Sequence, residues 1–336
     1  MKNLLYIGNK LDNGKSNITT IDTLGKHLEE EGFHLTYSSK KINKILRLVD
    51  MVYSLIKNSN RLDFVLIDTY STQNFYYALI ISQLCRLFNL KYITILHGGD
   101  LPNRLKFSPK LSSYIFKNSF LNVSPSLYLK QIFEHYGIKN VKYIPNSIEI
   151  KNYPFTLKKI TKPKLFWLRS FKEIYNPLMA IHVVKKIKDK GIDCELCMVG
   201  PNGDGSFLYA QNLVRELNVN VKLKLKMAKK DWIKLSKDYN IFLNTTNFDN
   251  MPVSVIEAMA LGFPVVSTNA GGMPYLIING KDGLLVEIND VDEMANQIIR
   301  LISDSELVSE LSRNARIKAE QFDWEVIKKE WNKILN

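Results

Sequence analysis

Two carboxylates, Asp249 and Glu257, have seven residues between them in the second half of the chain. Asp249 follows the apolar run 241–243, and Glu257 lies in a segment expected to be helical from about Pro252. A proline suits the first helical position, because the N–H that it lacks would have no partner there. Helix N-termini attract phosphate, and carboxylates accept hydrogen bonds from hydroxyl groups. The segment therefore predicts a site for a nucleotide or a nucleotide-sugar.

The elements that position this segment are short apolar runs that alternate with longer helical patterns. The alternation predicts parallel sheets with helices on both faces, and its two series predict two Rossmann-like domains. The expected strands are 4–7, 34–37, 64–67, 92–96, 121–123 and 142–144, then 165–168, 195–199, 221–226, 241–243, 264–267 and 284–288. The expected helices include 17–31, 41–57, 177–190 and 291–302.

The boundary between the domains is expected in a linker over 149–164, which has two prolines and few periodic apolar positions. We assign 1–155 to the first domain and 156–321 to the second, and expect a last helix, 322–336, to pack back on the first domain. A ligand should lie at the carboxyl ends of the strands, in a cleft between the two domains.

The composition is that of a globular protein, with 46% hydrophobic and 24% charged residues. The net charge of +13 favours an anionic partner, which is a nucleic acid, an anionic membrane surface or a phosphorylated substrate. Three cysteines are too few for a disulfide framework. The first residues are typical of a strand and not of a secretory signal, and the longest apolar run, 76–88, is too short to span a bilayer. We expect a cytoplasmic protein.

Residues 40–58 allow two interpretations. Apolar side chains recur there at helical spacing on one stripe, and lysines and an arginine occupy the other faces. The stripe could cover the sheet of the first domain, with solvated lysines outside. Alternatively, the segment attracts anionic lipid headgroups, which would make the protein peripheral on the cytoplasmic face of the inner membrane.

Residues 14–16, Gly-Lys-Ser, imitate part of a P-loop, and the strand 65–68 imitates its Mg²⁺-binding partner. A P-loop needs a glycine five residues before the Gly-Lys pair, so that successive N–H groups surround the phosphates. That position is Asn9, and Gly8 is one residue too far. The sequence therefore disfavours a P-loop, and it predicts no metal site.

Further motifs surround the two carboxylates. In these motifs and the two carboxylates, the chain resembles a glycosyltransferase of the GT-B fold, within family 4 of the retaining glycosyltransferases. The resemblance covers most of residues 1–330. The likeness is strongest over 239–288, where the Glu-x7-Glu signature of the family reads Asp249-x7-Glu257. The other matching segments are 144–148, 198–203, 262–266, the Gly-Gly-x-Pro turn in 269–274, and 279–286.

The resemblance implies roles for residues of the second domain. Glu257 would accept hydrogen bonds from the ribose of the donor, Asp249 would face the hexose hydroxyls, and Arg169 would stabilise the diphosphate. Asp249 and Arg169 would thus be catalytic. The other expected donor-binding residues, including backbone N–H groups around 251–254, are Lys172, Gly200, Asn250, Met251, Val253, Ser254, Gly271 and Gly272.

Two positions depart from the family pattern. The lysine that usually follows the arginine is missing, since 174–177 reads Ile-Tyr-Asn-Pro, and Lys172 is the candidate replacement. Tyr275 stands where the family has an acid after Gly-Gly-x-Pro. The grip on the diphosphate and the hexose is therefore expected to differ from that of the family.

In the first domain, the resemblance implies that His97, which follows a strand, is a third catalytic residue that orients the sugar or the leaving group. Gly8, Gly14 and Asp100 are expected to bind the acceptor.

The resemblance implies a retaining transfer of a hexose-type sugar from a nucleotide-diphosphate sugar, without a metal or cofactor. The acceptor would be a hydroxyl of a glycan or a lipid-linked molecule, in the synthesis of lipopolysaccharide or capsule. Alternatives are a nucleotide-sugar epimerase or a phosphorylase of the same fold. A basic nucleic-acid-binding protein is disfavoured, because no recognition motif accompanies the charge.

Overall fold

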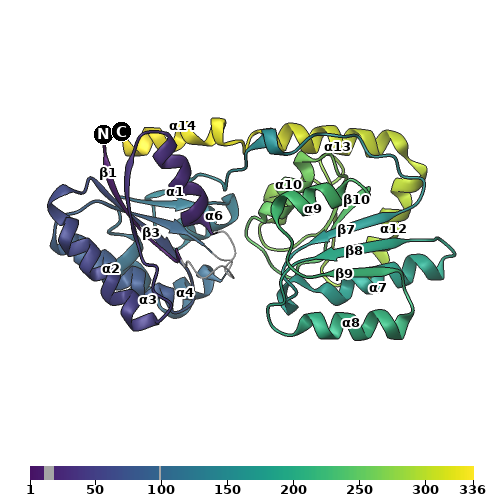
Figure 1. The fold of residues 1–336 in the computed structure, drawn as a ribbon, viewed down its shortest axis with the longest axis horizontal. Coiled ribbons are helices and arrows are strands. Elements are labelled where there is room, and N and C mark those ends of the chain that lie inside the picture. The colour runs from purple at the N-terminus through teal and green to yellow at the C-terminus, as the bar shows by residue number, and fades with distance from the viewer. Residues whose placement is uncertain (11–18, 98–99) are drawn as a thin grey trace. The chain divides into compact units, whose positions relative to one another are not determined.

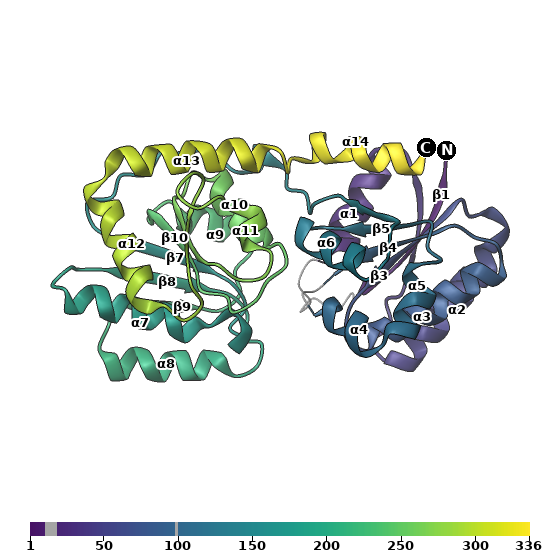
Figure 2. The ribbon, with the colours of Figure 1, turned by 180° about the vertical axis from the view of Figure 1, so that it is seen from behind.

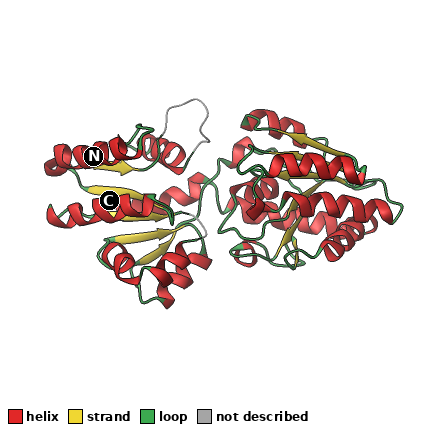
Figure 3. Ribbon diagram, turned by 90° about the horizontal axis from the view of Figure 1, so that it is seen from below, coloured by secondary structure: helices red, strands yellow, loops and turns green. Residues whose placement is uncertain are grey.

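The structure, a computed structural model, describes residues 1–10, 19–97 and 100–336. It contains two compact units, Met1–Pro145 with Lys328–Asn336, and Asn146–Ile327 (Figure 1). Both are α/β units in which the strands lie between helices (Figure 3).

The first unit is built on a sheet of six described strands, all parallel, in the order β2-β1-β3-β4-β5-β6. The strands are β1 (Asn3–Ile7), β2 (His34–Ser38), β3 (Phe64–Thr69), β4 (Tyr92–Leu96), β5 (Leu121–Ser124) and β6 (Val141–Tyr143). The helices are α1 (Thr20–Glu30), α2 (Lys44–Asn58), α3 (Asn74–Leu87), α4 (Leu101–Phe107), α5 (Pro109–Phe116) and α6 (Leu127–His135). Every residue of β3 and β4 is buried, as the continuous apolar runs of a sheet covered on both faces require.

The second unit repeats this plan, with the described parallel strands in the order β12-β11-β10-β7-β8-β9. The strands are β7 (Lys164–Leu168), β8 (Glu195–Val199), β9 (Val221–Lys224), β10 (Ile241–Asn244), β11 (Val265–Thr268) and β12 (Leu284–Val286). The helices are α7 (Pro177–Asp189), α8 (Ser206–Leu217), α9 (Lys229–Ser236), α10 (Val253–Ala260), α11 (Met273–Leu276), α12 (Val291–Ser303) and α13 (Ser305–Glu320). The last helix, α14 (Trp324–Leu335), begins in this unit and continues into the first. Short 3-10 turns cover Ser59–Arg61, Ile150–Asn152 and Glu173–Tyr175. The two Rossmann-like domains predicted from the alternation are confirmed.

The boundary between the units lies after Pro145, whereas the sequence placed it after residue 155. Residues 146–155 belong to the second unit because the side chain of Tyr153 is buried there, and because Arg316 donates a hydrogen bond to the Tyr153 carbonyl oxygen over 2.8 Å. The last residues, 328–336 in α14, belong to the first unit (Figure 2). Lys328 pairs there with Glu31, and Glu330 pairs with Lys142.

Helix α2 does not cover the sheet with its apolar stripe. The face that α2 buries carries Arg47, Met51 and Leu55, and the stripe expected to pack inward is exposed. The first interpretation of residues 40–58 is therefore wrong about the face: α2 packs on the core of its unit through Met51 and Leu55, with its lysines exposed, and most of the apolar stripe stays outside. In the part of the chain that the structure describes, no helix combines the length and the apolar character needed to cross a bilayer.

Candidate functional site

Most of the predicted donor-binding residues lie where parallel strands of the second unit end. Arg169 follows β7, Gly200 follows β8, the segment 245–252 follows β10, and Gly271 follows β11. These four strands are neighbours in the sheet, in the order β11-β10-β7-β8. Since the carboxyl ends of parallel strands share one edge of a sheet, residues far apart in sequence meet there.

Arg169 and Asp249 form an ion pair at this edge, with side chains that are 14% and 15% exposed. The other carboxylate oxygen of Asp249 accepts a hydrogen bond from the backbone N–H of Asn250 over 2.7 Å. The guanidinium also lies 3.4 Å from the Ser254 hydroxyl and 4.0 Å above the centre of the Tyr175 ring. Its Nε is buried with no hydrogen-bond partner. Asp249, Ser254 and Tyr175 thus hold the guanidinium in place, while its Nε–H donor has no partner. A fixed guanidinium with a donor to spare suits the binding of an anion.

Helix α10 begins beside this ion pair. Pro252 is its N-cap, one position before the first helical residue where the sequence placed it. Met251 and Asn250 are buried, whereas Val253 and Ser254 are partly exposed. The first N–H groups of a helix have no partner within the helix, and they carry the positive end of its dipole. The N-terminus of α10 and the guanidinium of Arg169 therefore lie at one place, where Asp249 pairs with the guanidinium.

Glu257 is buried within α10, and one of its oxygens, Oε1, has two partners. It accepts a hydrogen bond from the Tyr153 hydroxyl over 2.7 Å and lies 2.8 Å from the Lys229 ammonium. Burial and the negative charge of Glu257 raise the pKa of Tyr153, so its hydroxyl stays a donor. Oε2 has lone pairs for a further ligand, such as a pair of vicinal hydroxyls.

Two glycines are required by contacts between backbone segments. A Cβ on Gly200 would lie 1.7 Å from the carbonyl oxygen of Arg169, and a Cβ on Gly272 would lie 1.7 Å from that of Asn250. Gly272 also donates its N–H to the Asp249 carbonyl over 2.8 Å, and Gly271 has a positive φ of 57°. The expected donor-site glycines therefore fix how closely the loops approach one another.

Lys172 lies against a different loop. A Cβ on Gly203 would be 2.4 Å from Cγ of Lys172, so the lysine side chain runs over that glycine. Its positive charge contributes to lowering the pKa of Asp204, after the hydrogen bonds from Ser206 and Glu173. That Lys172 replaces the missing diphosphate lysine stays a prediction. Tyr275, at the position of the missing acid, is 39% exposed in α11.

In the first unit, His97 follows β4 and contacts Asp68 of β3, the neighbouring strand. Nε2 of His97 lies 2.8 Å from Oδ1 of Asp68, and the imidazole stacks on Tyr70 at 4.9 Å between ring centres. The same carboxylate oxygen accepts a hydrogen bond from the Tyr6 hydroxyl over 3.0 Å, and both Asp68 and His97 are buried. Because a carboxylate accepts, Nε2 donates to it, and Nδ1 is left as the second functional nitrogen of the ring.

The other predicted residues of this unit have different surroundings. Gly8 lies against Asp68, since a Cβ there would be 2.4 Å from its Oδ2, an oxygen that is buried without a hydrogen-bond partner. Asp100 is exposed at the start of α4 and accepts a hydrogen bond from Asn103. Gly14 lies outside the described residues.

Three residues that contact the predicted site residues were not predicted from the sequence. They are Tyr153 and Lys229, which contact Glu257, and Asp68, which contacts His97. Tyr153 is 104 residues from Glu257, in a stretch that reads as a linker. Asp68 appeared only as part of the discarded P-loop pattern, although an acid inside a fully apolar strand run is itself a signal of a buried polar contact.

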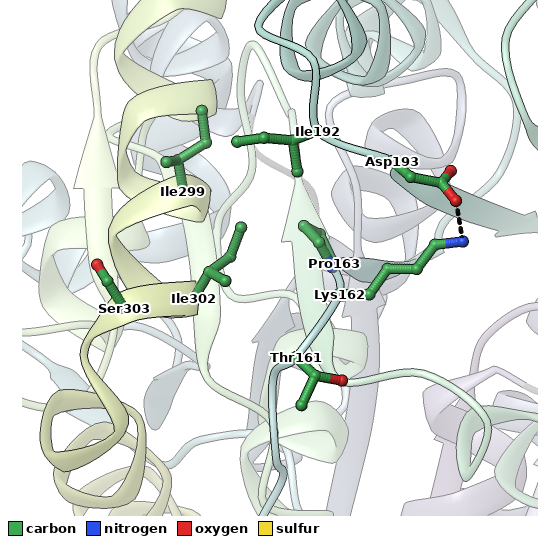
Figure 4. Close-up of a pocket in the computed structure, with 8 residues that line it drawn as sticks. All are labelled: Thr161, Lys162, Pro163, Ile192, Asp193, Ile299, Ile302 and Ser303. Atoms are coloured by element: carbon green, nitrogen blue, oxygen red, sulfur yellow. Dashed lines mark hydrogen bonds and ion pairs between the residues drawn. The ribbon is translucent and has the colours of Figure 1, made fainter.

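A separate pocket lies in the second unit, at the amino ends of β7 and β8 (Figure 4). It has a volume of about 360 Å³ and is lined by Thr161, Lys162, Pro163, Ile192, Asp193, Ile299, Ile302 and Ser303. Lys162 and Asp193 pair with each other across one side of it. None of the predicted site residues lines this pocket, which is at the opposite end of the strands from Arg169.

Solved structures of similar fold include sucrose-phosphate synthase from Thermosynechococcus elongatus. That enzyme has a TM-score of 0.84 and 15% identity, and the match covers 99% of this chain and 98% of that one. HepE from Anabaena, solved in complex with UDP-glucose, has a TM-score of 0.78 and 17% identity, with 100% and 99% covered. The GT-B fold class predicted from the sequence is confirmed.

Among curated proteins, the UDP-Gal:alpha-D-GlcNAc-diphosphoundecaprenol alpha-1,3-galactosyltransferase of Escherichia coli is 25% identical over 193 residues. These residues are 53% of this chain and 49% of that enzyme, and the chain spans about half the length of several curated relatives that it matches. The family described as "Glycosyl transferases group 1" matches residues 150–318, which is half of the chain and includes Arg169, Asp249 and Glu257. The chain belongs to the glycosyl transferases group 1 family.

Proposed function

We propose that this protein is a retaining glycosyltransferase of family 4. It transfers a hexose-type sugar from a nucleotide-diphosphate sugar to a hydroxyl group of a glycan or lipid-linked acceptor. The single observation that carries the proposal is that Arg169 and the N-terminus of α10 lie together, through the contact between Arg169 and Ser254. A family member with an arginine beside a helix N-terminus is suited to bind a diphosphate.

The diphosphate gains negative charge as its bond to the anomeric carbon breaks. Arg169 and the N–H groups of α10 stabilise that charge, in a mechanism that uses no metal or cofactor. The carboxylate of Asp249 is paired with the guanidinium of Arg169 in this structure. An incoming diphosphate therefore displaces the carboxylate or binds the guanidinium together with it. The acceptor oxygen takes the place of the diphosphate on the sugar, and the hydroxyl proton is released.

The nucleoside is bound at Glu257. Its carboxylate is already oriented by Tyr153 and Lys229, and its second oxygen accepts hydrogen bonds from the ribose hydroxyls. A hydroxyl donor suits a buried carboxylate, because it adds a hydrogen bond without adding charge.

The names of relatives support the substrate classes. The Escherichia coli relative is named for a UDP-sugar donor and a lipid-diphosphate acceptor, and HepE was solved with UDP-glucose. We infer that this protein builds a cell-surface polysaccharide, of the lipopolysaccharide or capsule type, in the cytoplasm.

Thermal unfolding in the presence of UDP-, GDP- and ADP-sugars tests the donor class. At a concentration 100 times its Kd, a bound donor adds about 2.7 kcal/mol of stability, which raises Tm by roughly 5 °C. We expect such a shift with at least one of the nucleotides. The absence of a shift with all of them at millimolar concentration would contradict the proposal.

The donor that binds is then incubated with candidate acceptors, and the products are examined by mass spectrometry and by NMR of the anomeric proton. We expect a glycoside with the anomeric configuration of the donor. An inverted product would reject the retaining mechanism. Turnover that requires inorganic phosphate, or free sugar formed without an acceptor, would instead indicate a phosphorylase or an epimerase.

In the proposed mechanism, His97 orients the sugar or the leaving group, and Asp68 is a positioning residue that holds the His97 ring through its contact with Nε2. Asp68→Asn should lower kcat by about 10- to 100-fold, because misplacing a catalytic group by about 1 Å costs up to about 100-fold. The KM of the donor should change less than threefold, since the nucleotide binds in the other unit. Tyr6→Phe removes the second hydrogen bond to the same carboxylate oxygen and should have the smaller effect. Equal losses in both variants would show that Asp68 acts only through stability of the core.

A further inference from the structure

The outer face of α2 is apolar from one end of the helix to the other. Five side chains of this face are between 49% and 74% exposed: Ile45, Leu46, Val49, Tyr53 and Ile56. Ile42, which comes just before the helix, is 68% exposed. The spacing of the five places them on one continuous stripe of α2, and Ile42 precedes that stripe. Single exposed apolar residues are common on protein surfaces, whereas a contiguous row of five marks a binding surface.

The opposite face of α2 is buried, and it carries a cation, Arg47, beside Met51 and Leu55. Arg47 is only 7% exposed and donates hydrogen bonds to the carbonyl oxygens of Lys41 and Ile42, over 2.8 and 3.0 Å, and to the Asn9 side chain, over 2.9 Å. Asn43 caps the helix by accepting from the N–H groups of Ile45 and Leu46. A helix turned to bury the stripe would lose the hydrogen bond to Asn9, which lies outside the segment, and would expose Met51 and Leu55. The apolar face is therefore held outward by the fold.

Positive charge surrounds the stripe. Lys40, Lys41 and Lys44 lie exposed at its start, and Lys57 at its end. Asp50 is the acidic residue of the segment 40–58, and its carboxylate accepts a hydrogen bond from Ser38. We call the six apolar side chains and these four lysines the α2 patch. Figure 1 shows α2 at the margin of its unit, with α3 along its other side.

We propose that the α2 patch binds the surface of an anionic lipid membrane. The apolar stripe enters the boundary between headgroups and acyl chains, and the lysines stay at the level of the lipid phosphates. Lysine is suited to this arrangement, because its alkyl chain can lie along apolar surface while its ammonium remains in a polar layer.

Charge decides between a membrane and a second copy of this chain. In a symmetric pair of α2 patches, the lysines at the two ends would face one another, and Asp50 is the single acid in the segment to offset them. The net charge of +13 also opposes self-association. An anionic lipid surface satisfies both the apolar and the basic part of the patch.

Vesicle co-sedimentation tests the proposal with the whole protein. Vesicles of pure phosphatidylcholine and vesicles with 30% phosphatidylglycerol are compared at low and at 0.5 M salt. We expect the protein to sediment with the anionic vesicles at low salt, and to be released as salt screens the lysines. Replacing Lys41, Lys44 and Lys57 by Gln should weaken partitioning by about fivefold for each lysine removed, or about 100-fold together.

The apolar part is tested separately by the triple variant Ile45→Ser, Leu46→Ser and Val49→Ser, which should lose about tenfold or more in partitioning. Matched controls lie in the second unit. They are Lys230, Lys234 and Lys237 changed to Gln for the charge, and the exposed Leu208 and Tyr209 changed to Ser for the apolar surface. Both controls should bind vesicles as the unchanged protein does.

Equal sedimentation with neutral and anionic vesicles at low salt would overturn the proposal, and so would unchanged binding of both patch variants. A protein that ignores vesicles, but is a dimer by analytical ultracentrifugation and becomes a monomer in the Ser variant, would assign the patch to a second copy. Because these measurements need no donor and no acceptor, they stand apart from any test of the glycosyltransferase activity.

Discussion

Arg169→Ala should lower kcat for sugar transfer by about 100- to 1000-fold. Removing one preformed group that stabilises developing charge in a transition state has an effect of this size, about 2.7–4 kcal/mol. Arg169 is placed for this role by its ion pair with Asp249, by Tyr175 beneath it and by Ser254 at the start of α10. The measurement is steady-state kinetics with the donor identified by the nucleotide screen.

Three variants separate the possible reasons for that loss. Arg169→Lys keeps the charge but not the two-pronged geometry, and should recover only part of the rate. Arg300→Ala, which removes an exposed arginine of α12, should leave the rate unchanged. If Asp249 acts only by holding Arg169, then adding Asp249→Asn to Arg169→Ala should cause no further loss. A loss below threefold for Arg169→Ala would remove Arg169 from the mechanism.

Glu257→Ala should weaken nucleotide binding by about 10- to 100-fold. Hydrogen bonds to a charged group contribute about 1.5–3 kcal/mol, and the ribose would lose its acceptor. Isothermal titration with the nucleoside diphosphate measures the change directly. The Tm of the free variant should also fall, because the buried Tyr153 hydroxyl loses its partner.

The control for this stability effect is Tyr153→Phe. This variant removes the same hydrogen bond from the free protein but keeps the carboxylate. Its Kd for the nucleoside diphosphate should therefore stay within about threefold of the Kd of the unchanged protein. Glu310→Ala removes an exposed glutamate of α13 and should alter neither Tm nor Kd. If Glu257→Ala binds the nucleotide as tightly as the unchanged protein, Glu257 does not bind the ribose.

The parts of the fold that could be predicted from sequence are those with a local signal. Continuous apolar runs identify buried parallel strands, and Arg169 and Asp249 could be placed together because each follows such a run. The Gly-Gly-x-Pro turn is likewise local, since Gly271 needs a positive φ.

The parts that could not be predicted depend on contacts between distant segments. The apolar stripe of α2 indicates an amphipathic helix, but periodicity does not tell that the face with Arg47, Met51 and Leu55 is the one that packs inward. Arg47 is buried because two carbonyl groups and Asn9 satisfy its guanidinium, and no spacing rule contains that arrangement. The partners of Glu257 and His97 come from other strands and loops, 104 and 29 residues away for Tyr153 and Asp68.

The contacts at Gly200 and Gly272 have a consequence for how donor preference can be altered. Each glycine lets the backbone of one loop contact the backbone of the next, and together these loops form the frame of the site. Substituting either glycine would push the two loops apart, so the spacing of the loops cannot be tuned by single substitutions there. Engineering toward a different sugar should therefore leave both glycines in place and vary the side chains that the frame presents, at 172–175 and 246–250. Libraries restricted to those positions should yield folded variants with new donors more often than libraries that include the glycines.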